Sequence, residues 1–180
     1  MNKKLKNILI IVTAVLVIGS CIFMFIISPI SKTEKVDEIG NMEMVAANTI
    51  TDELTRDIVV EQKFINKTEN INEIAVVFTR NYYLQEKDAN TQVVIELCEG
   101  NAVLCSESIV ANDIPDQHRV YVRPSSPITD KVGKELTLRI YVKEDCDSGV
   151  SIMVNDEVNS NYKFGNKKMS GSICFSITGE

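Results

Sequence analysis

The chain has no tryptophan and only one histidine, His118, among its 180 residues, and 6% of the residues are aromatic. It has no C-x-x-C pair, so the ligand spacing of a structural zinc site is missing. It has no G-x-S-x-G motif either, so His118 has no recognisable serine to activate. These absences predict a non-enzyme in which His118 is a surface residue at the start of a strand.

Charge is absent from a long stretch near the N-terminus, between Lys6 and Lys32. The apolar run 8–30 exceeds the roughly 20 residues that a helix needs to cross a hydrocarbon core. Lysines precede this run and no acidic residue occurs before Glu34, a bias that keeps the N-terminus in the cytoplasm. We therefore predict a single-pass protein of the cell membrane, with cytoplasmic residues 1–7, a transmembrane signal anchor at 8–30 and the remainder extracytoplasmic.

Two other interpretations of this segment stay open. A cleaved signal peptide usually has about 7–15 apolar residues and a small-residue cleavage site, whereas this run is longer and ends without an A-x-A pattern. A lipoprotein signal would make Cys21 the lipid-bearing mature N-terminus, because Ile18–Cys21 resembles a lipobox; against it, Ile22–Ile27 stays apolar. With either an uncleaved anchor or a lipoprotein signal, the domain lies outside and is tethered to the membrane.

The remainder of the chain predicts a stalk at 31–49 and one domain at 50–180, within the usual size of about 100–150 residues. Without the three lysines before the anchor, 16 basic residues face 25 acidic ones, a formal charge of −9. Such a charge repels nucleic acid and anionic lipid, so we expect neither as a partner. Net negative charge also keeps an exported domain soluble, and this alone is enough to explain why the domain is acidic.

After residue 50, apolar and polar residues alternate, as in strands that turn one face to a core and the other to water. The predicted strands are Ile58–Ile65, Ile74–Thr79, Gln92–Cys98, Val103–Ile109, Arg119–Arg123, Leu136–Lys143, Val150–Val154 and Ile173–Thr178. No convincing helical period occurs there, apart from one turn at Ile109–Ile114 that Pro115 ends. Strands without covering helices bury their apolar faces against each other, in a sandwich, a jelly roll or a barrel. We predict an all-β, jelly-roll-like antiparallel β-sandwich of about eight strands behind one N-terminal transmembrane helix.

Four sequence runs carry a family resemblance: QKFINKTENINEIAVVFTR, VVIELCEGNAVLCSESIVANDI, ITDKVGKELTLRIYV and GSICFSITG. In strand rhythm and turns, residues 58–179 resemble the extracytoplasmic jelly-roll modules associated with bacterial cell-surface polysaccharide assembly proteins. The resemblance implies a jelly-roll fold and an accessory role at the cell surface. It includes no catalytic motif, so it implies no active site.

Tyrosines next to polar residues form the first candidate site. Sugar rings stack on flat aromatic faces, so Tyr82 and Tyr83, beside Arg80, are candidates for glycan binding, as is Tyr162 in the predicted loop Asn155–Ser172. The absence of tryptophan weakens this interpretation, and tyrosines also commonly pack under loops. Adjacent residues on an extended chain point in opposite directions, so at most one of the first two tyrosines can face a ligand.

A calcium site is the second candidate, and no other cofactor is expected. Asp145 and Asp147 are spaced two apart before Gly149, as in oxygen-ligand loops. Calcium needs about 6–8 oxygen ligands, and even with Glu144 only a few are evident. A solvated turn between two strands explains the same pattern.

The extracytoplasmic cysteines are Cys98, Cys105, Cys146 and Cys174. An even number in an oxidising compartment favours disulfides, and four cysteines allow three connectivities. We prefer the pairs 98–105 and 146–174; four free thiols are the alternative. A hairpin tip at Asn101–Ala102 would set the first two cysteines opposite each other, whereas a tip at Gly100–Asn101 would offset them by two positions.

The sequence favours a membrane-anchored, non-catalytic extracytoplasmic binding or accessory module, for cell-surface polysaccharide or for a membrane protein that assembles it. Its contacts are expected on loops at one end of the sandwich. One alternative is a structural or scaffold protein with a protein partner, which an extended apolar patch would favour. The other is a carboxylate-based glycan hydrolase, which would need two convergent carboxylates about 5–10 Å apart.

Overall fold

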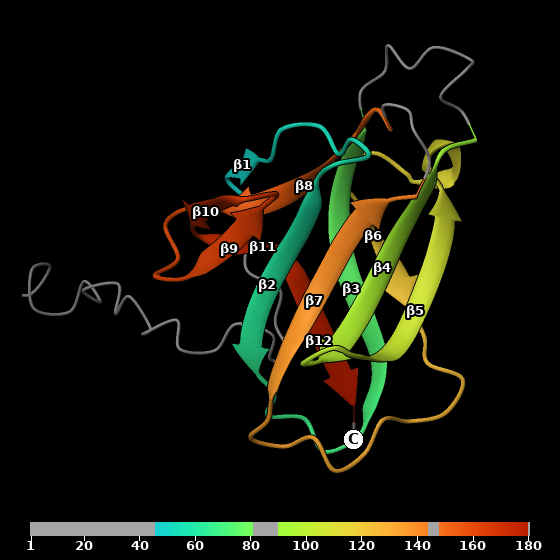
Figure 1. Cartoon of the computed structure of the whole chain (residues 1–180), viewed down its shortest axis with the longest axis vertical. Helices are drawn as coiled ribbons and strands as arrows, with labels where there is room; N and C mark the ends of the chain where they lie inside the picture. The colour runs from blue at the N-terminus through green and yellow to red at the C-terminus, as the bar shows by residue number, and fades with distance from the viewer. Residues whose placement is uncertain (1–45, 81–89, 144–147, 180) are drawn as a thin grey trace, which may run out of the picture. The chain divides into compact units, whose positions relative to one another are not determined.

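The computed structural model describes residues 46–80, 90–143 and 148–179. Their strands form two antiparallel sheets, packed as a β-sandwich (Figure 1). The strands are β1 (Thr49–Ile50), β2 (Val59–Ile65), β3 (Ile71–Arg80), β4 (Gln92–Glu99), β5 (Ala102–Val110), β6 (His118–Val122), β7 (Glu135–Val142), β8 (Val150–Asn155), β9 (Asn161–Phe164), β10 (Lys167–Ser170), β11 (Ser172–Ile173) and β12 (Phe175–Gly179). The predicted all-β fold with two sheets is confirmed.

The order of the strands follows a simple pairing rule. The first sheet has the order β1-β8-β3-β12, with β6 also paired to β3 and β11 to β8; the second has the order β10-β9-β2-β7-β4-β5. Antiparallel pairs join β1 to β8, β2 to β7, β3 to β6 and β4 to β5. These are the pairs that one long hairpin would make. The hairpin is folded over, so that β1·β8 and β3·β6 lie in the first sheet and β2·β7 and β4·β5 lie in the second.

The core lies between the two sheets and explains the alternation in the sequence. On β7, Leu136, Leu138 and Ile140 are fully buried, and the residues between them face outward. From the first sheet, Phe175 reaches Phe64 of the second, with 5.1 Å between the ring centroids. Each such side chain contributes about 1.5–3 kcal/mol when it leaves water, so the inward rows hold the sheets together.

Seven of the eight predicted strands are present, with ends shifted by a few residues; the eighth, Ile173–Thr178, is divided at Cys174 into β11, which pairs with β8, and β12, which pairs with β3. The predicted turn before Pro115 is a 3₁₀ turn at Ala111–Asp113. The sequence did not predict β1 or the hairpin β9–β10, which lies within the predicted loop Asn155–Ser172. Every residue of β10 is exposed, so this strand has no inward side chain to produce an alternating pattern.

A buried glutamine joins this hairpin to both sheets. β2 pairs with β9 at two positions, and the last of these sets Glu61 opposite Lys163. The next residue, Gln62, is fully buried. Its Nε2 donates to the carbonyl oxygen of Asn161 at 3.2 Å, and its Oε1 accepts from the backbone N–H of Ile173 at 3.3 Å. One side chain therefore supplies the hydrogen bonds that a continued strand pairing would otherwise make.

In the parts of the chain that the structure describes, no helix is long and apolar enough to span a membrane. The predicted anchor at 8–30, with Cys21, and the cytoplasmic residues 1–7 lie outside those parts, as does most of the predicted stalk. These assignments stay predictions.

We predict that Gln62→Leu lowers the free energy of unfolding by about 1–3 kcal/mol, because it leaves the buried N–H of Ile173 without an acceptor. Urea unfolding of the full chain in detergent, followed by tyrosine fluorescence, measures this loss. Gln92→Leu, at the half-buried end of β4, is the matched control and should cost less than about 1 kcal/mol. Equal stability of Gln62→Leu and the wild type would contradict this role of the amide.

Candidate functional site

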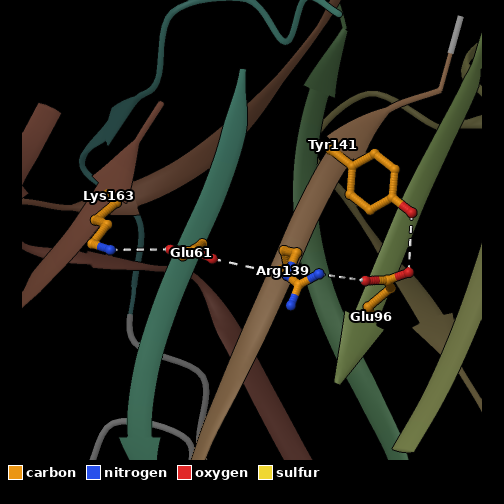
Figure 2. Close-up of polar contacts among 5 residues, drawn as sticks. All are labelled: Glu61, Glu96, Arg139, Tyr141 and Lys163. Atoms are coloured by element: carbon orange, nitrogen blue, oxygen red, sulfur yellow. Dashed lines mark hydrogen bonds and ion pairs between the residues drawn. The ribbon is translucent and has the colours of Figure 1, made fainter. Parts of the chain in front are cut away.

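A row of alternating charges crosses the outer face of the second sheet (Figure 2). The strand register sets Lys163 of β9 opposite Glu61 of β2, Glu61 opposite Arg139 of β7, and Arg139 opposite Glu96 of β4. The distances are 3.3 Å from Lys163 Nζ to Glu61 Oε2, 3.8 Å from Arg139 Nε to Glu61 Oε1, and 3.3 Å from Arg139 Nη1 to Glu96 Oε2. We call these four residues the charged row.

Tyr141 extends the charged row along β7. Its hydroxyl donates to Glu96 Oε1 at 3.0 Å (Figure 2). Burial raises the pKa of the Tyr141 phenol, and the hydrogen bond to the Glu96 carboxylate raises it further. The phenol is therefore a fixed donor at neutral pH. Because Glu96 is only 9% exposed, these contacts are shielded more than surface ion pairs, which contribute about 0–1 kcal/mol.

A cleft opens at one end of the charged row, where the β9–β10 hairpin diverges from β2. It has a volume of about 240 Å³. It is lined by Glu61, Lys63, Asn161, Tyr162, Lys163, Asn166 and Lys168. We call it the lysine cleft. Next to the last backbone pair, Glu61 with Lys163, the buried Gln62 side chain holds the two strands together by its hydrogen bond to the Asn161 carbonyl oxygen.

A second cavity lies beside the same hairpin, with a volume of about 530 Å³. Its lining includes the apolar residues Ile50, Ile58, Phe164 and Met169, together with charged Lys167. Ile50 and Met169 are among the exposed large hydrophobic residues of the chain. This cavity therefore has a mixed lining, in which these apolar residues lie next to charged Asp52 and Lys167.

The expectation that Tyr162 is an exposed aromatic is wrong. Tyr162 is 6% exposed and belongs to the hydrophobic core. The segment is the strand β9 and not a loop, so its side chains alternate: Asn161 and Lys163 are exposed, and Tyr162 points inward. Burial raises the pKa of its phenol. Tyr162 also lines both cavities beside the hairpin, but with only 6% of it exposed it offers no open ring face for stacking.

Arg80 is tied to a neighbouring turn. Its Nη1 donates to the carbonyl oxygen of Asn112 at 2.8 Å, and its Nη2 donates to the side-chain oxygen of the same residue. Its backbone N–H donates to Asp116 Oδ1 at 3.0 Å. Arg80 therefore holds the 3₁₀ turn against the end of β3. His118 begins β6 and is exposed, as predicted.

Several predicted site residues lie outside the described residues: Tyr82, Tyr83, Asp145, Asp147 and Cys146. Their roles in glycan, calcium or disulfide binding stay predictions. Within the described ranges, no group of three or more histidine, cysteine, aspartate or glutamate side chains is placed to hold a metal ion.

The β4–β5 hairpin takes the register that offsets its two cysteines. Its tip is Gly100–Asn101, and Gly100 supplies the positive φ of 57° that the turn needs. Cys98 lies opposite Val103 and Cys105 opposite Leu97, with a bulge between the two pairs. Both cysteines are free thiols. A disulfide between them stays a prediction that this register disfavours.

One exposed aromatic was missed on the other sheet. Tyr121 of β6 is 45% exposed, and the Arg123 guanidinium lies 5.5 Å from its ring centroid. Arg123 also pairs with Glu73 at 2.7 Å. In the predicted strand Arg119–Arg123, alternation with Val120 and Val122 places Tyr121 outward. This alternation is the sequence signal that could have identified Tyr121 as an exposed aromatic.

No known family model matches the chain, and no curated protein shows significant sequence similarity to it. Function is therefore inferred from the residues of this chain alone.

Cys174 provides a pH-dependent test of the packing. The thiol is 1% exposed, and burial raises its pKa from about 9 to about 11. The unfolded chain thus loses this proton at lower pH than the folded chain does. The stabilising contribution of the protonated thiol is complete below pH 9 and is lost as the pH rises to about 11.

We predict that the reduced wild-type chain loses about 2 kcal/mol more unfolding free energy between pH 9 and pH 11 than Cys174→Ala does. Urea unfolding at a series of pH values, with reductant present, gives both curves. Parallel curves for the two proteins would show that the thiol titrates alike in the folded and unfolded chains.

Proposed function

We propose that the chain is a membrane-anchored, non-catalytic binding module outside the cytoplasm, acting on cell-surface polysaccharide or on the machinery that assembles it. The proposed ligand surface is the outer face of the second sheet, from the lysine cleft along the charged row to Tyr141. A face of this kind differs from the loop platform expected from the sequence.

We also propose that the domain is a jelly roll. The four antiparallel pairs β1·β8, β2·β7, β3·β6 and β4·β5 support this, because a jelly roll is an eight-stranded double sheet built from two Greek keys. In this arrangement β2, β7 and β4 lie side by side, which brings residues far apart in the sequence onto one face.

The observation that carries the proposal is the continuity of the charged row with the lysine cleft. Sugars present many hydroxyl groups, each of which donates and accepts hydrogen bonds. The charged row and the cleft offer ammonium, carboxylate, guanidinium and amide groups in sequence along one face. Hydrogen bonds to ionised groups are about twice as strong as neutral ones, and groups held by their neighbours lose little entropy on binding.

The same contacts favour binding over hydrolysis. A retaining or inverting glycosidase needs one carboxylic acid and one free carboxylate on either side of the scissile bond. Here Glu61 and Glu96 both pair with the guanidinium of Arg139, which lies between them. A sugar could not enter between these carboxylates without displacing the arginine.

A protein partner is the second candidate, and the cavity beside β10 is the observation that favours it. Exposed Ile50 and Met169 border that cavity, next to Ile58 and Phe164. Interface cores are richer in apolar and aromatic residues than their rims, so a partner inserting a side chain there would bury these residues.

We predict that the full chain sediments with the host's own wall or capsule polysaccharide and that Tyr141→Ala weakens this binding about tenfold. The reason is loss of the aromatic face beside the charged row, a contact worth roughly 1.4 kcal/mol. Co-sedimentation in a polyoxyethylene detergent, which carries neither sugar nor charge, measures the bound fraction.

Tyr121→Ala is the matched control, because Tyr121 is exposed on the opposite sheet. Loss of binding in Tyr121→Ala, with Tyr141→Ala unaffected, would move the ligand to the other face. Failure of the folded wild type to sediment with any of these polysaccharides would contradict the glycan proposal and favour a protein partner.

A further inference from the structure

The lysine cleft has a charge opposite to that of the chain as a whole. Three lysines, Lys63, Lys163 and Lys168, line it against one carboxylate, Glu61. The chain carries a formal charge of −6. Three basic side chains thus meet in one cleft of an acidic protein.

Two of these lysines lie directly opposite each other. In the β9–β10 hairpin, Lys168 is the cross-strand partner of Lys163. Like charges in such positions destabilise an antiparallel pair, because their Cβ atoms are only about 4.5–5.5 Å apart. An anion between the two ammonium groups would turn this repulsion into attraction.

The carboxylates nearby are already shared. Lys163 pairs with Glu61 at 3.3 Å, but Glu61 also pairs with Arg139. Lys63 pairs with Glu135 at 2.7 Å. Lys168 has no ion-pair partner within the described ranges, and every residue of its strand is exposed. Because Arg139 is balanced in turn by Glu96, the charge that the cleft keeps unpaired is that of Lys168.

We propose that the lysine cleft binds the acidic group of an anionic saccharide, a carboxylate or a phosphate, between Lys163 and Lys168. The inference rests on the proposed function and names the class of ligand. Asn161 and Asn166 supply amide groups for the hydroxyls of the same sugar. A volume of about 240 Å³ is below the roughly 300–1,000 Å³ of drug-sized sites, and suits one sugar residue of a longer chain.

The net negative charge of the protein does not prevent this binding. At physiological salt, charges farther away than about 8–10 Å are largely screened, so the lysines at the contact dominate. The same screening sets an expectation: the affinity for an acidic saccharide falls as ionic strength rises.

The test is titration calorimetry of the full chain in a polyoxyethylene detergent. The carboxylate probe is oligogalacturonate, its neutral match is the fully methyl-esterified oligomer, and the phosphate probe is a glycerol phosphate oligomer. We expect one or both acidic probes to bind, the ester to bind at least tenfold more weakly than the acid form, and Lys168→Gln to weaken acidic binding about three- to tenfold.

Lys167→Gln is the matched control. Lys167 is the adjacent residue on β10, its substitution removes the same charge, and it lines the other cavity. It should leave the affinity within about twofold. Without ligand, Lys168→Gln should raise the Tm by roughly 1–3 °C, because it removes the lysine–lysine repulsion, whereas Lys167→Gln should not.

Equal binding of the acid and its methyl ester would overturn the anionic ligand while leaving a glycan module in place. Equal weakening by both lysine substitutions would show a diffuse charge effect and overturn the site. Absence of binding by either acidic probe, with sedimentation on host polysaccharide retained, would also overturn the anionic ligand. If the chain bound neither acidic probe and also failed to sediment with host polysaccharide, the proposed function itself would be overturned.

Discussion

The buried amide of Gln62 is the contact on which the arrangement of the candidate site depends. It replaces backbone pairing between β2 and β9 and bonds to β11, so it ties the hairpin to both sheets. Up to that point the strands are paired, which sets Lys163 opposite Glu61; beyond it they diverge, which opens the lysine cleft. Amide groups are costly to bury without partners, so Gln62 favours this one geometry over looser alternatives.

The two faces of the second sheet have different roles because side chains on a strand alternate. Inward residues such as Leu138 and Ile140 build the core, and the intervening Arg139 and Tyr141 necessarily face outward. The core thus fixes the register, and the register lines up the charges. Stability and site geometry are coupled in this way: a one-residue slip of β7 would bury Arg139 and separate it from both glutamates.

Much of the fold could be predicted from the sequence, because the eight principal strands show the alternation that a half-buried strand requires. The hairpin β9–β10 could not be predicted, because its strands are short and no side chain of β10 is buried. The error over Tyr162 has the same cause: a residue in an unrecognised strand was assigned to a loop.

The candidate site was much harder to predict. The charged row joins residues from four strands, and Glu61 and Lys163 are 102 positions apart. Pairing over such distances depends on the strand register. Residue spacing alone does not set the register, as the bulge near Cys98 in the β4–β5 hairpin shows. The sequence placed Arg139 and Tyr141 on an outer face but carried no signal for their neighbours.

The most direct test of the account is an amide chemical-shift map of the full chain, in detergent, titrated with oligogalacturonate and with the glycerol phosphate oligomer. We expect at least one acidic probe to shift residues of β9, β10 and β2 around Lys163 and Lys168, extending along the charged row. Shifts centred on Tyr121 and β6, or no shifts with either probe at millimolar concentration, would contradict binding at the lysine cleft.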